Sequence, residues 1–171
     1  MHNKHTYCFE TGDGKNRSLL GSKGAASCEL TQLGINVPPG FIISAQVSEA
    51  YFANGYLNTG LMAEISEQIA KIEVQTGKIF GGDSDPLLVS VRSSTATADS
   101  GLMKSILNLG LNKLTVAGLL EATDDARFVY DTYQRFIHAF GNLILGISDD
   151  QFTDQFNLVK SSAGINLDSA L

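Results

Sequence analysis

Glycine is the feature that most constrains how this chain can fold, because it divides the sequence into short segments. Seventeen glycines but only three prolines occur among 171 residues. Glycine ends helices and permits tight turns at positive φ, whereas proline-rich stretches form stiff, extended linkers. The composition therefore predicts many short helices and strands joined by tight connections, and no proline-rich linker.

Composition and charge narrow the classes of protein. Hydrophobic residues make up 43% and charged residues 18% of the chain, which allows a sizeable core and excludes a disordered protein. The longest apolar runs, Leu87–Val91 and Leu143–Ile147, are far shorter than the ~20 residues that cross a bilayer. The first ten residues lack the apolar segment of a signal peptide, so we expect a cytoplasmic protein with no membrane partner.

The net charge argues against a nucleic-acid partner. Twelve Lys and Arg residues against eighteen Asp and Glu residues give a formal charge of −6. A surface that follows nucleic-acid phosphates needs a basic stripe, and the sequence contains none. We expect no nucleic-acid partner, although one or two cations are enough to hold a small anionic ligand.

Apolar periodicity predicts strands intermixed with helices. Apolar and β-branched runs predict strands at Tyr7–Phe9, Phe41–Ile43, Leu87–Arg92 and Ile106–Leu111, the last as a strand or an irregular segment. Residues at helical spacing predict helices at Ala25–Leu33, Val47–Asn54, Leu61–Ile72 and Phe128–Phe140, the first three closed by Gly34, Gly55 and Gly77. The dense run Leu87–Arg92 predicts a strand buried on both faces. Together these elements predict an α+β (mixed α/β) domain in which helices pack on a mixed sheet.

The first candidate binding segment is LGSKGA, residues 20–25, in which two glycines flank Ser22 and Lys23 just before a predicted helix. Glycine lets the backbone approach a ligand closely, and a helix N-terminus offers unpaired N–H groups and partial positive charge. Lys23 adds a point charge for a phosphate oxygen. The segment is not a P-loop, because the G-x-x-x-x-G-K-[ST] spacing is absent. The alternative is a simple turn with a solvated lysine.

The second candidate is Arg92, the charge that ends an otherwise apolar strand. Ligand sites in α/β proteins lie where strands lead into loops, and the planar guanidinium binds phosphate with two parallel hydrogen bonds. Ser93 follows Arg92 directly, and Ser94, Thr95 and Thr97 add further hydroxyl groups. The alternative is a structural arginine paired with one of the many carboxylates.

Other reactive side chains give weaker signals. His2 and His5 lie near the N-terminus, where we expect mobility, and His138 falls on the polar face of a predicted helix. No spacing of Cys, His and acidic residues predicts a metal site. The acids in predicted loops, which we expect to be solvated, are Asp83, Asp85, Asp124 and Asp125. Cys8 and Cys28 are expected to be free thiols, with Cys28 buried among small apolar residues.

Five motifs occur in an order that resembles one enzyme family. They are LLGSKGA, INVPPGF, DPLLVSVRS, ILNLGLN and RFVYDTYQRFI. From about Tyr7 to about Phe156, the chain resembles the N-terminal nucleotide-binding region of pyruvate, phosphate dikinase, and it is related to phosphoenolpyruvate synthase through the glycine–lysine segment and the strand end.

The resemblance implies the first lobe of an ATP-grasp domain that binds ATP and Mg²⁺. Its activity would be the transfer of a phosphoryl group to a histidine on another domain, and ultimately to pyruvate to give phosphoenolpyruvate. Lys23 and Arg92 match the family's phosphate-binding lysine and arginine, with Arg92 in the catalytic role. Gly21, Gly24 and Ser93 complete the expected ATP site. The Mg²⁺ ligands and the phosphohistidine domain are expected in a second lobe and in other domains.

The sequence departs from the dikinase pattern after Arg92. The family segment SGARASMPGMM reads SSTATADSGLM here, residues 93–103. Ala96 replaces an arginine and Asp99 adds a negative charge, which makes the loop less favourable for phosphate. The stretch resembles the synthase branch more closely, while Gly101 and Met103 persist.

Three hypotheses follow for residues 1–160, with residues 161–171 as a weakly patterned tail. The first is a partial ATP-binding region that is inactive without its second lobe and phosphohistidine domain, whether dikinase-like or synthase-like. The second is a degenerate stand-alone domain for nucleotide binding or regulation, and the third is an inactive remnant. A missing lobe also predicts an exposed apolar face and self-association.

Overall fold

The computed structural model describes residues 4–93 and 105–164 of the chain. In chain order the elements are β1 (Thr6–Cys8), α1 (Arg17–Gln32), β2 (Phe41–Ile43), α2 (Ala45–Asn54), α3 (Leu61–Thr76), β3 (Val89–Arg92), β4 (Ser105–Leu109), α4 (Lys113–Thr123), α5 (Ala126–Leu143) and α6 (Asp149–Ser162). This mixture of helices and short strands confirms the α+β class.

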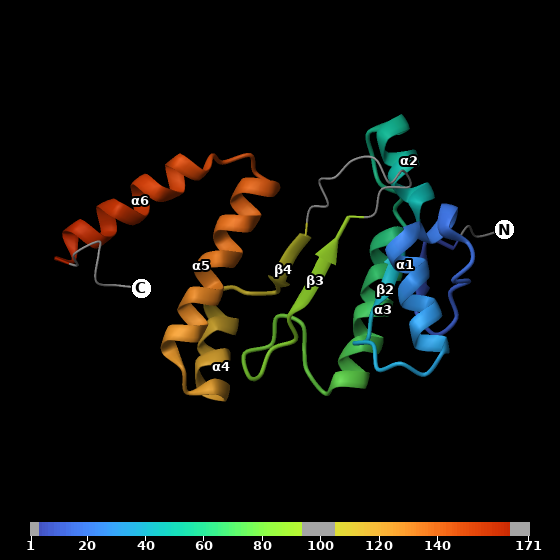
Figure 1. Cartoon of the computed structure of the whole chain (residues 1–171), viewed down its shortest axis with the longest axis horizontal. Helices are drawn as coiled ribbons and strands as arrows, with labels where there is room; N and C mark the ends of the chain where they lie inside the picture. The colour runs from blue at the N-terminus through green and yellow to red at the C-terminus, as the bar shows by residue number, and fades with distance from the viewer. Residues whose placement is uncertain (1–3, 94–104, 165–171) are drawn as a thin grey trace.

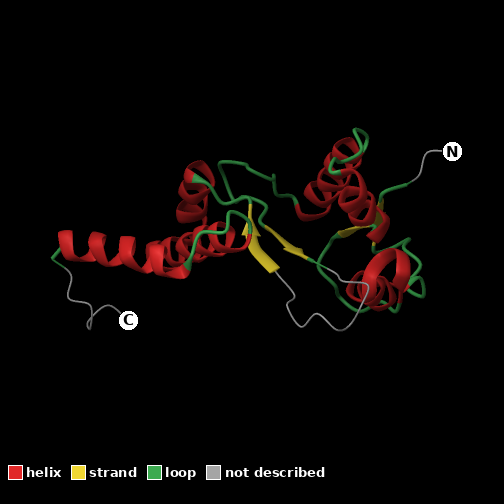
Figure 2. Cartoon of the chain, turned by 90° about the horizontal axis from the view of Figure 1, so that it is seen from above, coloured by secondary structure: helices red, strands yellow, loops and turns green. Residues whose placement is uncertain are grey.

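The elements lie in three groups along the long axis of the molecule. The first group contains α1, α2, α3 and the β1–β2 pair, and the last contains α4, α5 and α6. The β3–β4 pair lies between these two groups in both views (Figure 1 and Figure 2). At the far end, α6 extends away from the β3–β4 pair (Figure 1).

The strands form two antiparallel ribbons rather than the single mixed sheet that the sequence predicts. β1 pairs with β2, and β3 pairs with β4 with a register shift between Val89 and Val91. Parallel pairing within the described residues is limited to one isolated bridge between Phe80 and Leu87. β3 and β4 follow each other in the chain and pair directly as antiparallel strands.

The exposure of β3 corrects a second prediction. Leu87 is 6% exposed, but Val91 is 50% exposed, and Ser90 and Arg92 are also exposed. The segment Leu87–Arg92 is therefore buried only at its start and not on both faces. A two-stranded ribbon has no sheet layer beyond its partner strand, so only the part that lies against α4 and α5 loses contact with water.

The first core lies where α1 packs against β2. Leu20, Ala25 and Cys28 in α1 and Ile42 in β2 are at most 9% exposed. A Cβ added to Gly24 would lie only 2.9 Å from the Ile42 side chain. Glycine at this position therefore lets α1 approach β2 closely.

The second core belongs to the other end of the molecule. Leu111, Val116 and Val129 form its centre, and Tyr133 and Phe136 pack against it from α5. This confirms the buried face predicted for α5, except that Ile137, which was placed on that face, is 44% exposed. Glycine also permits a close contact here, because a Cβ at Gly118 in α4 would overlap the backbone of Asp83.

The ends of three helices confirm the glycine pattern, whereas two helices were not predicted. Gly55 and Gly77 cap α2 and α3 in the left-handed region, and Gly34 follows α1 with φ 78°. The helices missing from the prediction are α4 and α6. Of the helices in the described ranges, none combines the length and apolarity that a membrane span requires.

Candidate functional site

α1 is broken at Gly21, and this break lies within the first candidate segment. Gly21 has φ 68° and ψ 162°, a conformation that glycine adopts almost exclusively. The helix therefore begins at Arg17, earlier than predicted, and a new helical segment starts at Ser22. The N-terminal end of a helical segment carries partial positive charge.

Lys23 lies in the first turn after this break, and its side chain is exposed. Gly21 is buried, as is Ala25 at 0% exposed. The backbone on both sides of Lys23 is therefore packed into the first core. Gly24 makes the close contact with Ile42 described above, so packing already accounts for this glycine, and its role in binding a ligand stays a prediction.

Arg92 is the last residue of β3, opposite Ser105 in β4. Arg92 and the following Ser93 are both exposed. Arg92 forms no ion pair with any acid that the structure describes. The alternative prediction, a structural arginine held by a carboxylate, therefore has no support among these residues.

The structure gathers the candidate residues at two separate places. Gly21, Lys23 and Gly24 share one turn in the first group of elements, whereas Arg92 and Ser93 lie together at the end of the central ribbon (Figure 1). Residues 94–104 of the predicted loop lie outside the described residues. This range contains Ser94, Thr95, Ala96, Thr97, Asp99, Ser100, Gly101 and Met103.

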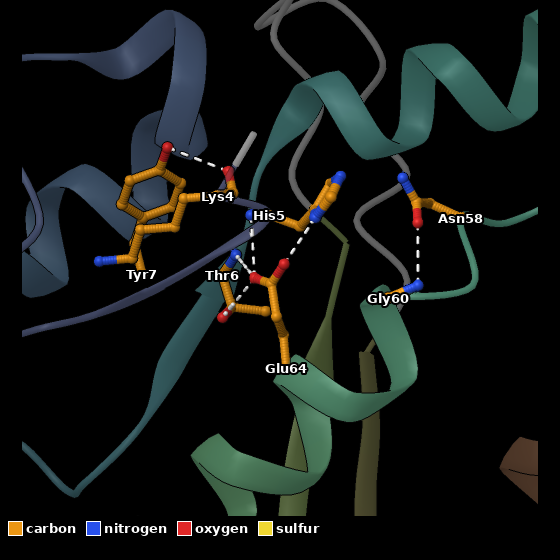
Figure 3. A network of polar contacts seen from close by, with 7 residues as sticks. All are labelled: Lys4, His5, Thr6, Tyr7, Asn58, Gly60 and Glu64. Carbon is orange, nitrogen blue, oxygen red and sulfur yellow. Dashed lines mark hydrogen bonds and ion pairs between the residues drawn. The ribbon is translucent and has the colours of Figure 1, made fainter. Parts of the chain in front are cut away.

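A polar network that the sequence did not predict joins β1 to α3 (Figure 3). Oε2 of Glu64 accepts hydrogen bonds from the backbone nitrogens of His5 at 2.9 Å and Thr6 at 3.0 Å, and from the Thr6 hydroxyl at 3.1 Å. Oε1 lies 2.6 Å from Nδ1 of His5. His5 is thus fixed against α3, which corrects the expectation that it is mobile.

These hydrogen bonds stabilise the ionised form of Glu64. The contact with the His5 side chain is the largest cause, and together with the other donors it lowers the pKa of Glu64 from 4.5 to about 2, although burial acts in the opposite direction. The network therefore fixes the position of β1 on α3 through a carboxylate that is ionised near neutral pH. Since His5 and Glu64 are 59 positions apart, no local sequence pattern links them.

Three further titratable side chains, His138, Asp125 and Asp85, make local structural contacts. Nε2 of His138 in α5 lies 2.9 Å from Oδ1 of Asp149 in α6. Asp125 caps α5 by accepting the backbone N–H of Phe128 at 2.9 Å, and Asp85 pairs with Lys78. In the described ranges, no group of three or more His, Cys, Asp or Glu side chains is arranged to hold a metal ion.

The cysteines agree with the sequence prediction. Cys8 and Cys28 are both free thiols, with Cys28 fully buried. Burial is the main cause that raises the pKa of Cys28, and negative charge from Cys8, Glu10 and Asp13 adds to it. Cys28 is therefore a poor nucleophile and a core residue.

The relatives found by comparison with known proteins are pyruvate, phosphate dikinases. The chain is 43% identical over 169 residues to pyruvate, phosphate dikinase of Entamoeba histolytica, an alignment that covers 98% of the chain. It is 44% identical over 91% of its length to the chloroplastic enzyme of Mesembryanthemum crystallinum, and 37% identical over 98% to the enzyme of Clostridium symbiosum. No protein-family model matches the chain.

These similarities extend over almost every element described above, so the chain shares its ancestry with a class of dikinases. It belongs by sequence to the pyruvate, phosphate dikinase family, as the five ordered motifs predict. The chain spans only 16–19% of the length of these three relatives.

Proposed function

We propose that this chain is the ATP-binding part of a dikinase-type phosphotransferase. The observation that supports this most is the break at Gly21, which places Lys23 on the first turn of a helical segment, where the helix carries partial positive charge. This combination of partial positive charge and a lysine suits the oxygens of a nucleotide phosphate.

Arg92 and Ser93 supply the second half of the proposed site. A guanidinium binds two phosphate oxygens at once, and Arg92 is exposed at the end of its strand. Phosphoryl transfer depends mainly on positioning and on neutralising charge, so two fixed cations would contribute to it directly. In this proposal Arg92 contacts the transferred phosphate, while Lys23, Gly21, Gly24 and Ser93 hold the nucleotide.

The rest of the reaction requires groups from elsewhere in a dikinase. Mg²⁺ would enter with the nucleotide, bound by its phosphates and by carboxylates of a second ATP-grasp lobe. A histidine on a further domain would accept the phosphoryl group, and pyruvate would receive it in turn. In agreement with this need, the chain spans less than a fifth of its dikinase relatives. By itself the chain is proposed to bind ATP without turnover, and its cytoplasmic location stays a prediction.

Thermal unfolding with MgATP tests the proposal. A ligand at 100 times its Kd stabilises the folded state by roughly 2.7 kcal/mol, which is easily measured for a chain of this size. We expect MgATP to raise the melting temperature, and Lys23→Ala or Arg92→Ala to remove most of that rise. Lys113→Ala and Arg127→Ala are matched controls, since both replace exposed cations in α4 and α5, away from the α1 turn and the end of β3.

The result that contradicts the proposal is a melting temperature that millimolar MgATP leaves unchanged, or a shift that survives both substitutions. In that case the exchanges at Ala96 and Asp99 would indicate a domain that has lost nucleotide binding. Membership of the family would be unaffected, because it rests on sequence identity alone.

A further inference from the structure

Ser44 carries a buried hydroxyl group that has no hydrogen-bond partner. The residue is only 2% exposed, and among the residues that the structure describes its side-chain oxygen is the one buried side-chain polar atom without a partner. Native proteins pair nearly all such groups, because an unpaired buried hydroxyl weakens the fold. An unpaired one therefore indicates that a ligand, an ion or a water supplies the missing hydrogen bond.

This hydroxyl lies at the start of α2, where it does not act as a capping group. Ser44 is the N-cap residue, with φ −62° and ψ 150°, but its side chain accepts no N–H from the first turn. The N–H of Val47 donates to the Ser44 carbonyl at 3.1 Å. Ala45 and Gln46 lie too early in the helix for an intrahelical acceptor, and neither N–H donates to another described residue. One hydroxyl and two N–H groups are thus available at this helix end.

The two preceding strands fix the position of this helix end. The N–H of Ser44 donates to the carbonyl of His5 at 2.9 Å, which extends the β1–β2 pairing by one residue. His5 is held in turn by Glu64 of α3 (Figure 3). A ligand would therefore find the donors already positioned, which lowers the entropic cost of binding.

The charge at the start of α2 favours an anion. The helix has ten residues, and no acidic residue lies in its first turn to neutralise the partial positive charge there. The carboxylate of Glu64, which reaches His5, is already occupied by the donors of His5 and Thr6. The turn reaches the surface at Gln46, which is exposed. A phosphate group has several strong acceptor oxygens, so it matches three donors at a helix N-terminus.

We propose that the start of α2 binds a phosphate group, which accepts hydrogen bonds from the Ser44 hydroxyl and from the N–H groups of Ala45 and Gln46. Free inorganic phosphate and a phosphate of a bound nucleotide share this chemistry. The nucleotide as the source rests on the proposed function above. It is compatible with the packing of α1, because Gly24, which follows Lys23, lies close against Ile42, two residues before Ser44.

Titration of the ¹⁵N-labelled chain with inorganic phosphate, at constant ionic strength, tests this site by NMR. We expect saturable shifts of the backbone amides of Ala45 and Gln46. Ser44→Ala should weaken binding about tenfold, the size expected for one hydrogen bond to a charged group. Ser48→Ala removes an exposed hydroxyl from the same helix and should leave binding unchanged.

A parallel titration with MgATP identifies the source of the phosphate group. Shifts of the same two amides with MgATP alone, weakened by Ser44→Ala, would assign the site to the nucleotide. The proposal is overturned if neither probe shifts these amides saturably, or if Ser44→Ala binds as tightly as the original chain. That failure is distinct from failure of the proposed function, because MgATP would still raise the melting temperature through Lys23 and Arg92.

The melting temperature of Ser44→Ala without ligand separates a binding role from a structural one. The hydroxyl makes no hydrogen bond, so its removal leaves no other group unpaired. We expect the variant to melt at or above the temperature of the original chain, and to gain less stability from whichever of phosphate and MgATP shifts the two amides. A lower melting temperature without ligand would assign the hydroxyl to the fold and contradict the proposal.

Discussion

Glu64 of α3 accepts the backbone N–H of Thr6 in β1 at 3.0 Å, although 58 residues separate them in the chain. Thr6 is 1% exposed, so water cannot replace this acceptor. A side chain thus satisfies a strand edge that would otherwise need another strand. The contact also joins β1, whose partner strand is β2, to the first turn of α3.

Removing this carboxylate should destabilise the fold. Glu64→Ala leaves the buried N–H of Thr6 without its acceptor, and we expect a loss of about 1–3 kcal/mol in the free energy of unfolding. Urea denaturation measures this loss. As a control, Glu67→Ala removes an exposed acid of the same helix and should cost less than about 0.5 kcal/mol. Equal effects of the two substitutions would contradict the role given to Glu64.

The same carboxylate predicts how stability depends on acid. The pKa of Glu64 falls from 4.5 to about 2 in the folded chain, so the folded state binds the proton less readily than the unfolded state. Its contribution is complete above pH 4.5 and is lost as the pH falls toward 2. Melting temperatures across this range should converge for the original chain and Glu64→Ala. A difference that stays constant down to pH 2 would argue against this ionisation.

Gly118 should tolerate no side chain. A Cβ at this position would overlap the backbone of Asp83, and backbone cannot move aside as a flexible side chain can. We expect Gly118→Ala to cost roughly 1–3 kcal/mol of stability. Gly60→Ala is the control, because its Cβ would meet only Oδ1 of Asn58 at an ordinary 3.5 Å. Chemical denaturation of both variants should separate them clearly.

The two thiols should react at very different rates. Burial raises the pKa of Cys28 and shields it, whereas Cys8 is only half-buried. A thiol reagent at neutral pH should therefore modify one cysteine quickly, and Cys8→Ser should abolish that fast phase. Two fast phases in the native chain would show that the packing around Cys28 opens readily.

Gly21→Ala tests the break in α1. In the backbone conformation of Gly21, a residue with a side chain is strained by on the order of 1–3 kcal/mol. The variant should therefore be less stable. If the helix straightens instead, the turn that carries Lys23 loses its shape, and the stabilisation by MgATP should disappear with it. Ser22→Ala leaves the backbone unchanged and should keep the response to MgATP.

Local sequence signals were sufficient for some elements and not for others. Gly34, Gly55 and Gly77 end their helices as predicted, because a left-handed C-cap depends on one residue and its immediate neighbours. α4 was missed although Asn112 and Thr115 form a capping box at its start. α6 was missed because its apolar residues are sparse, and Val159 remains 64% exposed.

Contacts distant in sequence account for the other differences. The density of apolar residues in Leu87–Arg92 predicts a strand, but the number of neighbouring strands decides whether both faces are buried. Likewise, the sequence around His5 did not predict its contact with Glu64, because Glu64 lies 59 positions away in α3. The sequence identified the family, whereas the roles of Lys23 and Arg92 in a site stay predictions. The break at Gly21 emerged only from the backbone conformation.

The break at Gly21 would affect the entropic cost of binding a phosphate at Lys23. Leu20 and Ala25 on either side are buried at 2% and 0% exposure, so the turn that carries Lys23 acquires its shape when the chain folds. A phosphate arriving there would not have to order a loop, and the entropic cost of positioning the backbone donors would already have been met. In this sense the proposed site would be preorganised, because the core, rather than the ligand, sets the geometry of the turn.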